Sequence, residues 1–487
     1  MRQPDDTEAE AAFMGTLLLL RTIGQSFNVT SPPLLAWLVA GYSLTVGTFI
    51  LFSGRLGDVF GYKRMFIMGL SWFSLWSLVA GLSVYSNYKL AVVSRVLQGI
   101  GPAICLPNAL AILGITYPPG HRKAMIFALF GSGAPVGSVF GGALASLLTL
   151  TWWPWALWAM SIWLALLAVA AGYVIPNLPR KTVHASDWKS WVRILDLPGA
   201  FIGISSLVLF NFAWTQSPID GWATPTVLVP LVLGVLLFGL FALIELRLSP
   251  MPLLPLDAVN ADVAFVLAAV VCGWASFGIW ILYLVQILQT IRNLSPLLTM
   301  AWLSPSAIAG AVAAVVTGKL LGPFKVKPAV LMTMAPAAFT AGSILTGLAP
   351  TDQVYWGQIF VSMLIMPFGM DMTFPAATLI MSDSMAKEHQ GIGASLVNTV
   401  VNYGIALGVA FAGTVEVHTH GDGESSEDIL RGYRGALYNG DGTRGFRIRR
   451  VLRVHGERRA SVSEAISVPK KRPDGPRGRR MNSNERA

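Results

Sequence analysis

Residues 54–64 read Gly54-Arg-Leu-Gly-Asp-Val-Phe-Gly-Tyr-Lys-Arg64 and separate two long apolar segments, 34–53 and 65–85. Each segment has about the twenty residues that an α-helix needs to cross the ~30 Å hydrocarbon core of a bilayer. The stretch between them is therefore expected to form a short turn at the membrane surface. Its basic residues assign that surface to the cytoplasm, because short loops rich in Lys and Arg stay on the cytoplasmic side.

The same stretch carries three glycines, which allow two helices and a turn to approach closely. Asp58 lies just before the second apolar segment. We expect its carboxylate to accept hydrogen bonds from free amides at the start of the next helix, where the helix dipole favours an anion.

The composition is that of a protein with many membrane spans. Of the 487 residues, 54% are hydrophobic and only 12% are charged. The net charge of +10 belongs to the end of the chain, because residues 431–487 hold sixteen of the 35 Lys and Arg and five of the 25 Asp and Glu. The remainder, with 19 basic and 20 acidic residues, has a net charge of −1. This distribution argues against nucleic-acid binding by the folded part.

Twelve apolar segments are long enough to span a membrane. They are 34–53, 65–85, 90–116, 124–148, 153–175, 197–215, 223–246, 262–288, 297–318, 329–349, 354–381 and 391–413. A first apolar run, 11–20, is too short to span alone and is closed by Arg21, so it predicts a shortened first helix. With this map, basic residues collect in the loops on one side, whereas the other side has only Lys89 and Arg292.

The C-terminal end does not continue this pattern. After the span ending at residue 413 a return helix should begin near Ala436, but the sequence becomes rich in Gly, Arg, Pro and Ser and predicts disorder. Two interpretations remain open, a last helix lost through an error in the gene model or a genuine unusual tail. We expect four regions: an N-terminal helix bundle (1–176), a basic connector with two additional helices (177–260), a C-terminal bundle (261–435) and a disordered tail (436–487).

The stretch 54–64 resembles the signature that the major facilitator superfamily carries between its second and third helices. The matching residues are Gly54, Leu56, Gly57, Asp58, Gly61, Lys63 and Arg64. The resemblance implies an all-α membrane fold of two six-helix bundles. The two additional spans resemble the fourteen-helix drug–proton antiporter branch, and local stretches such as Pro367-Phe-Gly-Met-Asp-Met-Thr-Phe-Pro375 are similar to its fungal aminotriazole-resistance group. In that family the cytoplasmic signature latches the carrier in one state.

Two further stretches resemble signatures of this superfamily. The fourth span opens Leu90-x-x-x-Ser-Arg95-x-x-Gln98-Gly99, and the resemblance implies a role for Arg95 in proton coupling; the alternative is an arginine that snorkels to the interface. The fifth span is similar to an antiporter signature, although its glycines are displaced, so simple helix packing is the alternative. Its residues are Gly131, Pro135, Gly137, Gly141 and Gly142.

Asp371 is the best acidic candidate for a second proton-coupling group, because it lies inside the span 354–381. A permanent pairing with a basic group at the inner interface is the alternative. Polar and aromatic residues inside other spans are candidates to line a substrate cavity, where they could bind an amine or azole solute. They are Asn108, Trp280, Tyr283, Asn398 and Asn402, and each could instead join helices or lie at the membrane interface.

The sequence shows no catalytic constellation, no metal-ligand spacing and no Walker loop, so we expect no enzyme activity, cofactor or metal, and an ion gradient as the energy source. The resemblance implies a proton-coupled exporter of small solutes or drugs. The alternatives are an importer or facilitator of a small cation such as ammonium, and a non-transporting receptor, scaffold or inactive product. The expected partners are a small-molecule substrate, protons and the lipid bilayer. We expect a monomer that binds no nucleic acid, in the plasma membrane rather than the vacuolar membrane.

Overall fold

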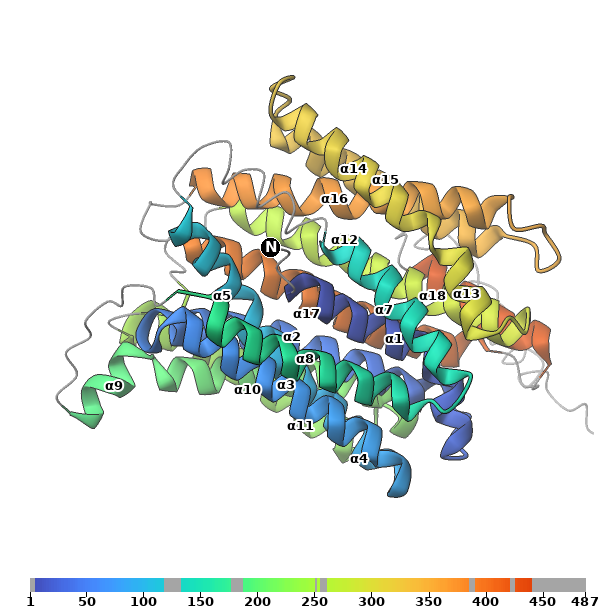
Figure 1. Ribbon diagram of the computed structural model, residues 1–487, viewed down its shortest axis with the longest axis horizontal. Helices are drawn as coiled ribbons and strands as arrows, with labels where there is room; N and C mark the ends of the chain where they lie inside the picture. Colours follow the sequence, from blue (N-terminus) through green and yellow to red (C-terminus); the bar gives the residue numbers. More distant parts are fainter. Residues whose placement is uncertain are drawn as a thin grey trace, which may run out of the picture. The chain divides into compact units, whose positions relative to one another are not determined.

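A computed structural model of the chain describes residues 5–117, 133–176, 187–249, 252–254, 261–384, 390–420 and 425–439. These residues are helical with short connections, and no strand occurs among them (Figure 1). Residues 1–441 form one compact unit. The basic tail that follows lies outside the described residues, so the prediction of disorder there stays a prediction.

The N-terminal bundle is made of α1 (Asp5–Ser26), α2 (Pro32–Phe60), α3 (Tyr62–Leu82) with the 3₁₀ turn η1 (Ser83–Tyr85), α4 (Tyr88–Gln98), α5 (Ile100–Thr116), α7 (Gly133–Thr149) and α8 (Pro154–Val174). The inserted segment holds α9 (Trp188–Ile194), α10 (Leu197–Asp220) and α11 (Pro225–Leu243), which ends in the π-helical η2 (Ile244–Leu248).

The C-terminal bundle begins with α12 (Ala261–Gln286), which ends in a second π-helical segment, η4 (Ile287–Ile291). It continues with α13 (Pro296–Leu303), α14 (Pro305–Leu321), α15 (Pro328–Leu348), α16 (Gln358–Ser384), α17 (Gln390–Thr419) and α18 (Ser426–Asn439).

Local sequence signals explain where several helices begin. Proline occupies the first or second position of α2, α8, α10, α11, α13, α14 and α15, where its missing N–H removes no helical hydrogen bond. The Asn87 side chain caps α4 by accepting a hydrogen bond from the Leu90 amide at 2.9 Å.

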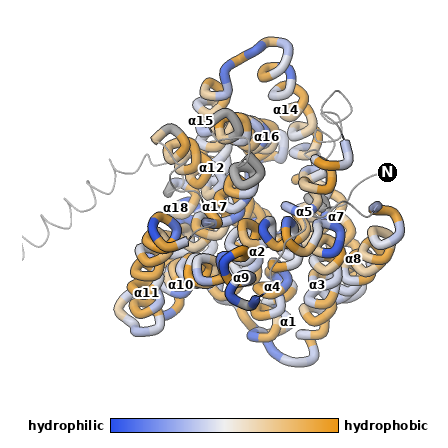
Figure 2. Tube along the Cα trace, turned by 90° about the vertical axis from the view of Figure 1, so that its left-hand side faces the viewer, coloured by the Kyte–Doolittle hydropathy of each residue, from blue (hydrophilic) through white to orange (hydrophobic). Residues whose placement is uncertain are grey.

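Eleven helices among the described residues are long and apolar enough to cross a membrane. The predicted span 124–148 is described from residue 133 onward, as α7. The outer helices such as α11 are mostly hydrophobic (Figure 2), and the rest of the protein leaves most of their large apolar side chains uncovered. Lipid is the environment that such a surface requires, so the prediction of an all-α membrane fold is confirmed.

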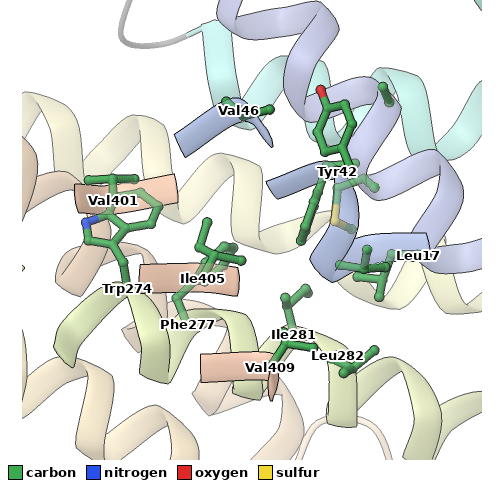
Figure 3. Packing of buried hydrophobic residues seen from close by; sticks show 14 of the residues in the cluster. Leu17, Tyr42, Val46, Trp274, Phe277, Ile281, Leu282, Val401, Ile405 and Val409 are labelled. Atoms are coloured by element: carbon green, nitrogen blue, oxygen red, sulfur yellow. The ribbon is translucent and has the colours of Figure 1, made fainter. Parts of the chain in front are cut away.

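The core joins the two bundles. Figure 3 shows Trp274 and Phe277 of α12 and Val401 and Ile405 of α17 packed on the side that faces α2, from which Val46 projects. The α17 backbone passes so close to α2 that a Cβ on Gly47 would lie 2.7 Å from the Tyr403 nitrogen. The interface between α2 and α17 therefore has no room for a solute at this level.

Three elements differ from the sequence-based predictions. The first helix, α1, has 22 residues rather than a ten-residue core, because it extends on both sides of the run 11–20. The stretch 54–60 is helical, and Gly61 alone makes the turn with φ of 95°, a conformation that favours glycine. After the last predicted span the chain forms a further 14-residue helix, α18, which begins at Ser426 and includes the first residues, 436–439, of the tail that was predicted to be disordered.

Candidate functional site

The residues of the signature stretch 54–64, called the gate from here on, lie where α2 ends and α3 begins. The Tyr62 hydroxyl donates a hydrogen bond of 2.5 Å to Asp58 Oδ1, so the donor observed here is a side chain of the next helix and not one of its amides. Gly57 is buried against Asn108 of α5, whose Nδ2 donates to Ile104 O at 2.6 Å and to Ser53 O at 3.4 Å. Asn108 thus packs against this end of α2.

The end of α2 also contacts the inserted segment. Arg55 Nε donates a hydrogen bond of 2.9 Å to the carbonyl oxygen of Ile194, the last residue of α9. The ring of Phe60 stacks on Trp191 of α9 at a centroid distance of 5.6 Å and an interplanar angle of 3°. A connection between the gate and the inserted helices was not expected from the sequence, because each contact crosses more than a hundred residues of chain.

Arg95 is buried inside the N-terminal bundle, with 2% of its surface exposed. Its Nε donates to Leu38 O at 3.2 Å, one terminal nitrogen donates to Ala12 O at 3.4 Å, and the other bonds to the Gln98 amide oxygen. The guanidinium lies 4.4 Å above the Tyr42 ring. These partners hold Arg95 away from the interface, so the snorkelling alternative does not describe this structure.

Two acidic side chains of α1 lie near Tyr42, whose ring contacts this arginine, and neither was identified from the sequence. The Glu8 side chain is buried, and Trp163 Nε1 donates to its Oε1 at 3.4 Å. The Glu10 side chain is half-buried and accepts a hydrogen bond of 3.3 Å from Ser138 Oγ. The intervening Ala9 carbonyl accepts a hydrogen bond of 3.0 Å from the Tyr42 hydroxyl. Both glutamates lie just before the apolar run 11–20, but the first helix was predicted from that run alone.

A small cavity adjoins Arg95. Its walls include Thr16 of α1, Leu38 of α2 and Trp153 next to α8, and its size is roughly that of one water molecule. Its lining is mostly apolar, with Thr16 and Arg95 as the polar side chains.

Asp371 lies in a separate cluster, in which α16 meets α14 and α7. A Cβ on Gly310 of α14 would lie 3.4 Å from Asp371 Oδ2 and 3.4 Å from Pro135 Cγ. The structure therefore brings Asp371 close to Pro135, which belongs to the glycine-rich motif of the fifth span (131–142). The two residues lie at a junction between the two bundles. Arg95 and Asp371 belong to different clusters.

The glycines of that motif pack α7 against α1 and α13. A Cβ on Gly141 would lie 2.3 Å from Ala11 Cα, and one on Gly142 would lie 2.4 Å from Met300 Sδ. Gly137 is buried. Gly131 lies outside the described residues. Close helix packing is thus what the described part of the motif does here.

The remaining candidates for a substrate cavity are engaged within the C-terminal bundle. Trp280 Nε1 donates to Thr346 Oγ1 at 2.9 Å and to Ser362 Oγ at 2.8 Å, and the Tyr283 hydroxyl donates to Glu416 Oε2 at 2.7 Å. On α17, Asn402 Nδ2 donates to Asn398 O at 3.1 Å. Trp280 and Tyr283 are buried, so a substrate would reach them only after these helices separate.

The opposite end of the bundles, predicted to face outward, is closed by contacts between α1 and η4. Arg21 bonds to the carbonyl oxygen of Gln289 and donates to Asn293 Oδ1 at 3.4 Å, while Gln289 Nε2 donates back to Leu18 O at 2.9 Å. Nearby, Arg292 donates to Gln353 O at 2.8 Å, and partial burial lowers the pKa of its guanidinium. Single π-helical turns such as η4 are frequent at functional sites in proteins.

The model of the Major Facilitator Superfamily matches residues 9–409, and the chain belongs to this family. It is 50% identical over 440 residues to the low affinity ammonium transporter of Saccharomyces cerevisiae, covering 90% of this chain and 84% of that one. It is 43% identical to the efflux pump terJ of Aspergillus terreus (89% and 83% covered) and 35% identical to the aminotriazole resistance protein of S. cerevisiae (89% and 79% covered).

The solved structure of a POT family transporter in complex with a thioalcohol-conjugated peptide has a similar fold, with a TM-score of 0.64 at 14% identity, covering 93% of this chain and 94% of that chain. The predicted resemblance to the fungal drug-efflux group of the superfamily is confirmed. The protein is thus an integral membrane transporter that carries small molecules across the bilayer.

Proposed function

We propose that this transporter exports small amine-like or azole solutes across the plasma membrane in exchange for protons. The observation that carries the proposal is the position of Glu8 and Glu10 on α1, inside the N-terminal bundle and next to the Tyr42–Arg95 pair. Burying an ionisable side chain inside a membrane domain costs free energy, so such a residue is a candidate for a functional role.

A carboxyl group can hold either a proton or a cationic solute, but not both at once. Exchange between the two couples their movements when the two bundles rock around the site. Arg95 donates hydrogen bonds to the backbone of both α1 and α2, so it can transmit a change at the α1 carboxyl groups to the gate helix. Asp371, at the junction of α7, α14 and α16, is the second proposed proton-binding group.

The proposal is tested in proteoliposomes with a pH gradient imposed across the membrane and radiolabelled aminotriazole as the probe. We expect the probe to move uphill toward the more acidic side, and the Glu10→Gln variant to lose this movement at least tenfold. Glu427→Gln, an exposed substitution on α18, is the matched control and should leave transport unchanged. Accumulation by Glu10→Gln equal to that of the unmodified protein would remove this glutamate from the coupling mechanism.

A second candidate function is the uptake of ammonium, which is favoured by the 50% identity to the yeast low affinity ammonium transporter. The two functions differ in the direction of flux. With labelled methylammonium as the probe, a facilitator equilibrates the cation whether or not a pH gradient is present, whereas an antiporter concentrates it on the acidic side.

A further inference from the structure

Two buried carboxyl groups meet at the end of the inserted helices that is predicted to face the cytoplasm. Asp196 immediately precedes α10, and Glu245 lies in η2 at the end of α11; their side chains are 4% and 5% exposed. A Cβ on Gly199 would lie 2.5 Å from Asp196 Oδ2 and 2.9 Å from Glu245 Oε1. The two oxygens therefore occupy the space that a side chain at residue 199 would fill, and only glycine lets them come this close.

The facing oxygens lack a donor. Glu245 Oε2 accepts a hydrogen bond of 3.2 Å from the Leu254 amide, but Asp196 Oδ2 and Glu245 Oε1 receive no hydrogen bond from the described residues. Two adjacent buried carboxylates repel each other, and each unsatisfied oxygen adds a desolvation cost. One added proton removes both costs, because it converts the repulsion into a hydrogen bond between the two carboxyl groups.

Within the described residues, the surrounding charges do not supply an alternative partner for these oxygens. The charged side chains on neighbouring elements are Arg55 and Asp58 on α2, Lys189 and Arg193 on α9, and Arg247 on η2. Lys189, Arg193 and Arg247 are exposed, Asp58 is bound by Tyr62, and Arg55 donates to Ile194 O. On α17, Tyr403 donates to Leu207 O, and Glu416 and His418 lie at the opposite end of the helix.

A metal ion fits the site less well than a proton does. No group of three or more potential metal ligands occurs among the described residues, and two carboxyl groups alone do not form a cation cage.

We propose that Asp196 and Glu245 bind one shared proton and form a clamp that responds to cytoplasmic pH and acts on the gate. Asp196 follows α9 directly, and its amide donates to Arg193 O at 3.3 Å. Trp191 of α9 stacks on Phe60, and Ile194 O accepts the hydrogen bond from Arg55, so α9 connects the pair to the end of α2. When the proton leaves, repulsion moves Asp196 away from Glu245 and weakens the contacts of α9 with the gate.

The clamp is tested in the purified full-length protein by infrared spectroscopy and hydrogen exchange. The variants are Glu245→Gln, whose amide donates to Asp196 at any pH, and Asp196→Asn, since Asn tolerates the left-handed conformation (φ 46°) of this position as Asp does. Infrared difference spectra of the unmodified protein should lose the C=O band of one carboxylic acid as the pH rises, and both variants should lack this band.

Hydrogen exchange of residues 187–200, corrected for intrinsic rates, should rise with pH in the unmodified protein and stay low in Glu245→Gln. Asp220→Asn is the control, because Asp220 is the last residue of α10, at the end opposite Asp196; it should behave like the unmodified protein. A carboxylic-acid band that persists in both variants, or exchange in Glu245→Gln that rises as in the unmodified protein, would overturn the clamp. These readouts do not depend on transport, so they remain decisive if the proposed antiport fails.

Discussion

In the N-terminal bundle, the Arg95 side chain connects three helices, α1, α2 and its own α4, through hydrogen bonds. The side chain is buried in a membrane domain. Its N–H groups donate to a backbone carbonyl of α1, a backbone carbonyl of α2 and the amide oxygen of Gln98. A buried guanidinium is stable in its charged form only when its N–H groups are hydrogen-bonded. The arrangement also depends on shape, because only a planar guanidinium can reach all three acceptors.

We therefore expect Arg95→Lys to lose transport almost as fully as Arg95→Ala, by at least tenfold, although the lysine keeps the charge. Both variants should still reach the membrane, which fluorescence of a fused reporter can check. Transport by Arg95→Lys at the unmodified level would show that charge alone, without the three-way hydrogen bonding, is sufficient.

At the same scale, some residues were predictable from sequence and others were not. Arg95 and Asp371 stand out because a charge interrupts an apolar run. Glu8 and Glu10 were missed because the first helix was judged by its apolar core alone, whereas helix α1 continues through both glutamates. The pair Asp196–Glu245 could not be found from sequence, because the two residues are 49 positions apart and each borders a polar loop.

Among the elements, the junction of α2 and α3 shows what sequence reasoning predicts well and where it fails. The two helices and the basic character of their connection follow directly from residues 34–85. The length of the connection does not, because residues 54–60 satisfy helical geometry although they contain two glycines. Only the backbone at Gly61, with φ of 95° and ψ of 129°, breaks the helix.

Gly61→Ala should therefore destabilise this junction by about 1–3 kcal/mol, the cost of a side chain at a strained backbone conformation. Gly54→Ala is a matched control, because a Cβ at residue 54 would meet only atoms at 3.6 Å or beyond. Thermal unfolding in detergent would measure the difference. Equal melting temperatures for the two variants would argue against a one-residue turn.

The contact between α1 and η4 makes a separate prediction about the opposite end of the bundles. Replacing both Arg21 and Gln289 with Ala removes side-chain hydrogen bonds that join the two bundles there. The open state should become more populated. A Leu18→Cys probe, at a position that is 0% exposed, should then react several-fold faster with an impermeant maleimide in intact cells. An unchanged labelling rate would mean that these contacts do not hold the closure.

For the whole molecule, the fold could be predicted largely from the hydrophobic pattern, since eleven of the predicted spans appear as long apolar helices and a twelfth is described in part. The packing of the bundles against each other could not, because it depends on close approaches such as that of α17 to Gly47. These contacts place polar groups in clusters whose members are distant in the chain.

The central claim is that proton movement and solute movement are coupled through the carboxyl groups of α1. It is tested most directly by trapping a pH-sensitive dye inside proteoliposomes and imposing a gradient of probe solute with no initial pH difference. The unmodified protein should move protons against the solute flux, and the double variant Glu8→Gln/Glu10→Gln should move none. Proton movement of equal size in both proteins, or solute flux without any proton movement in the unmodified one, would contradict the account.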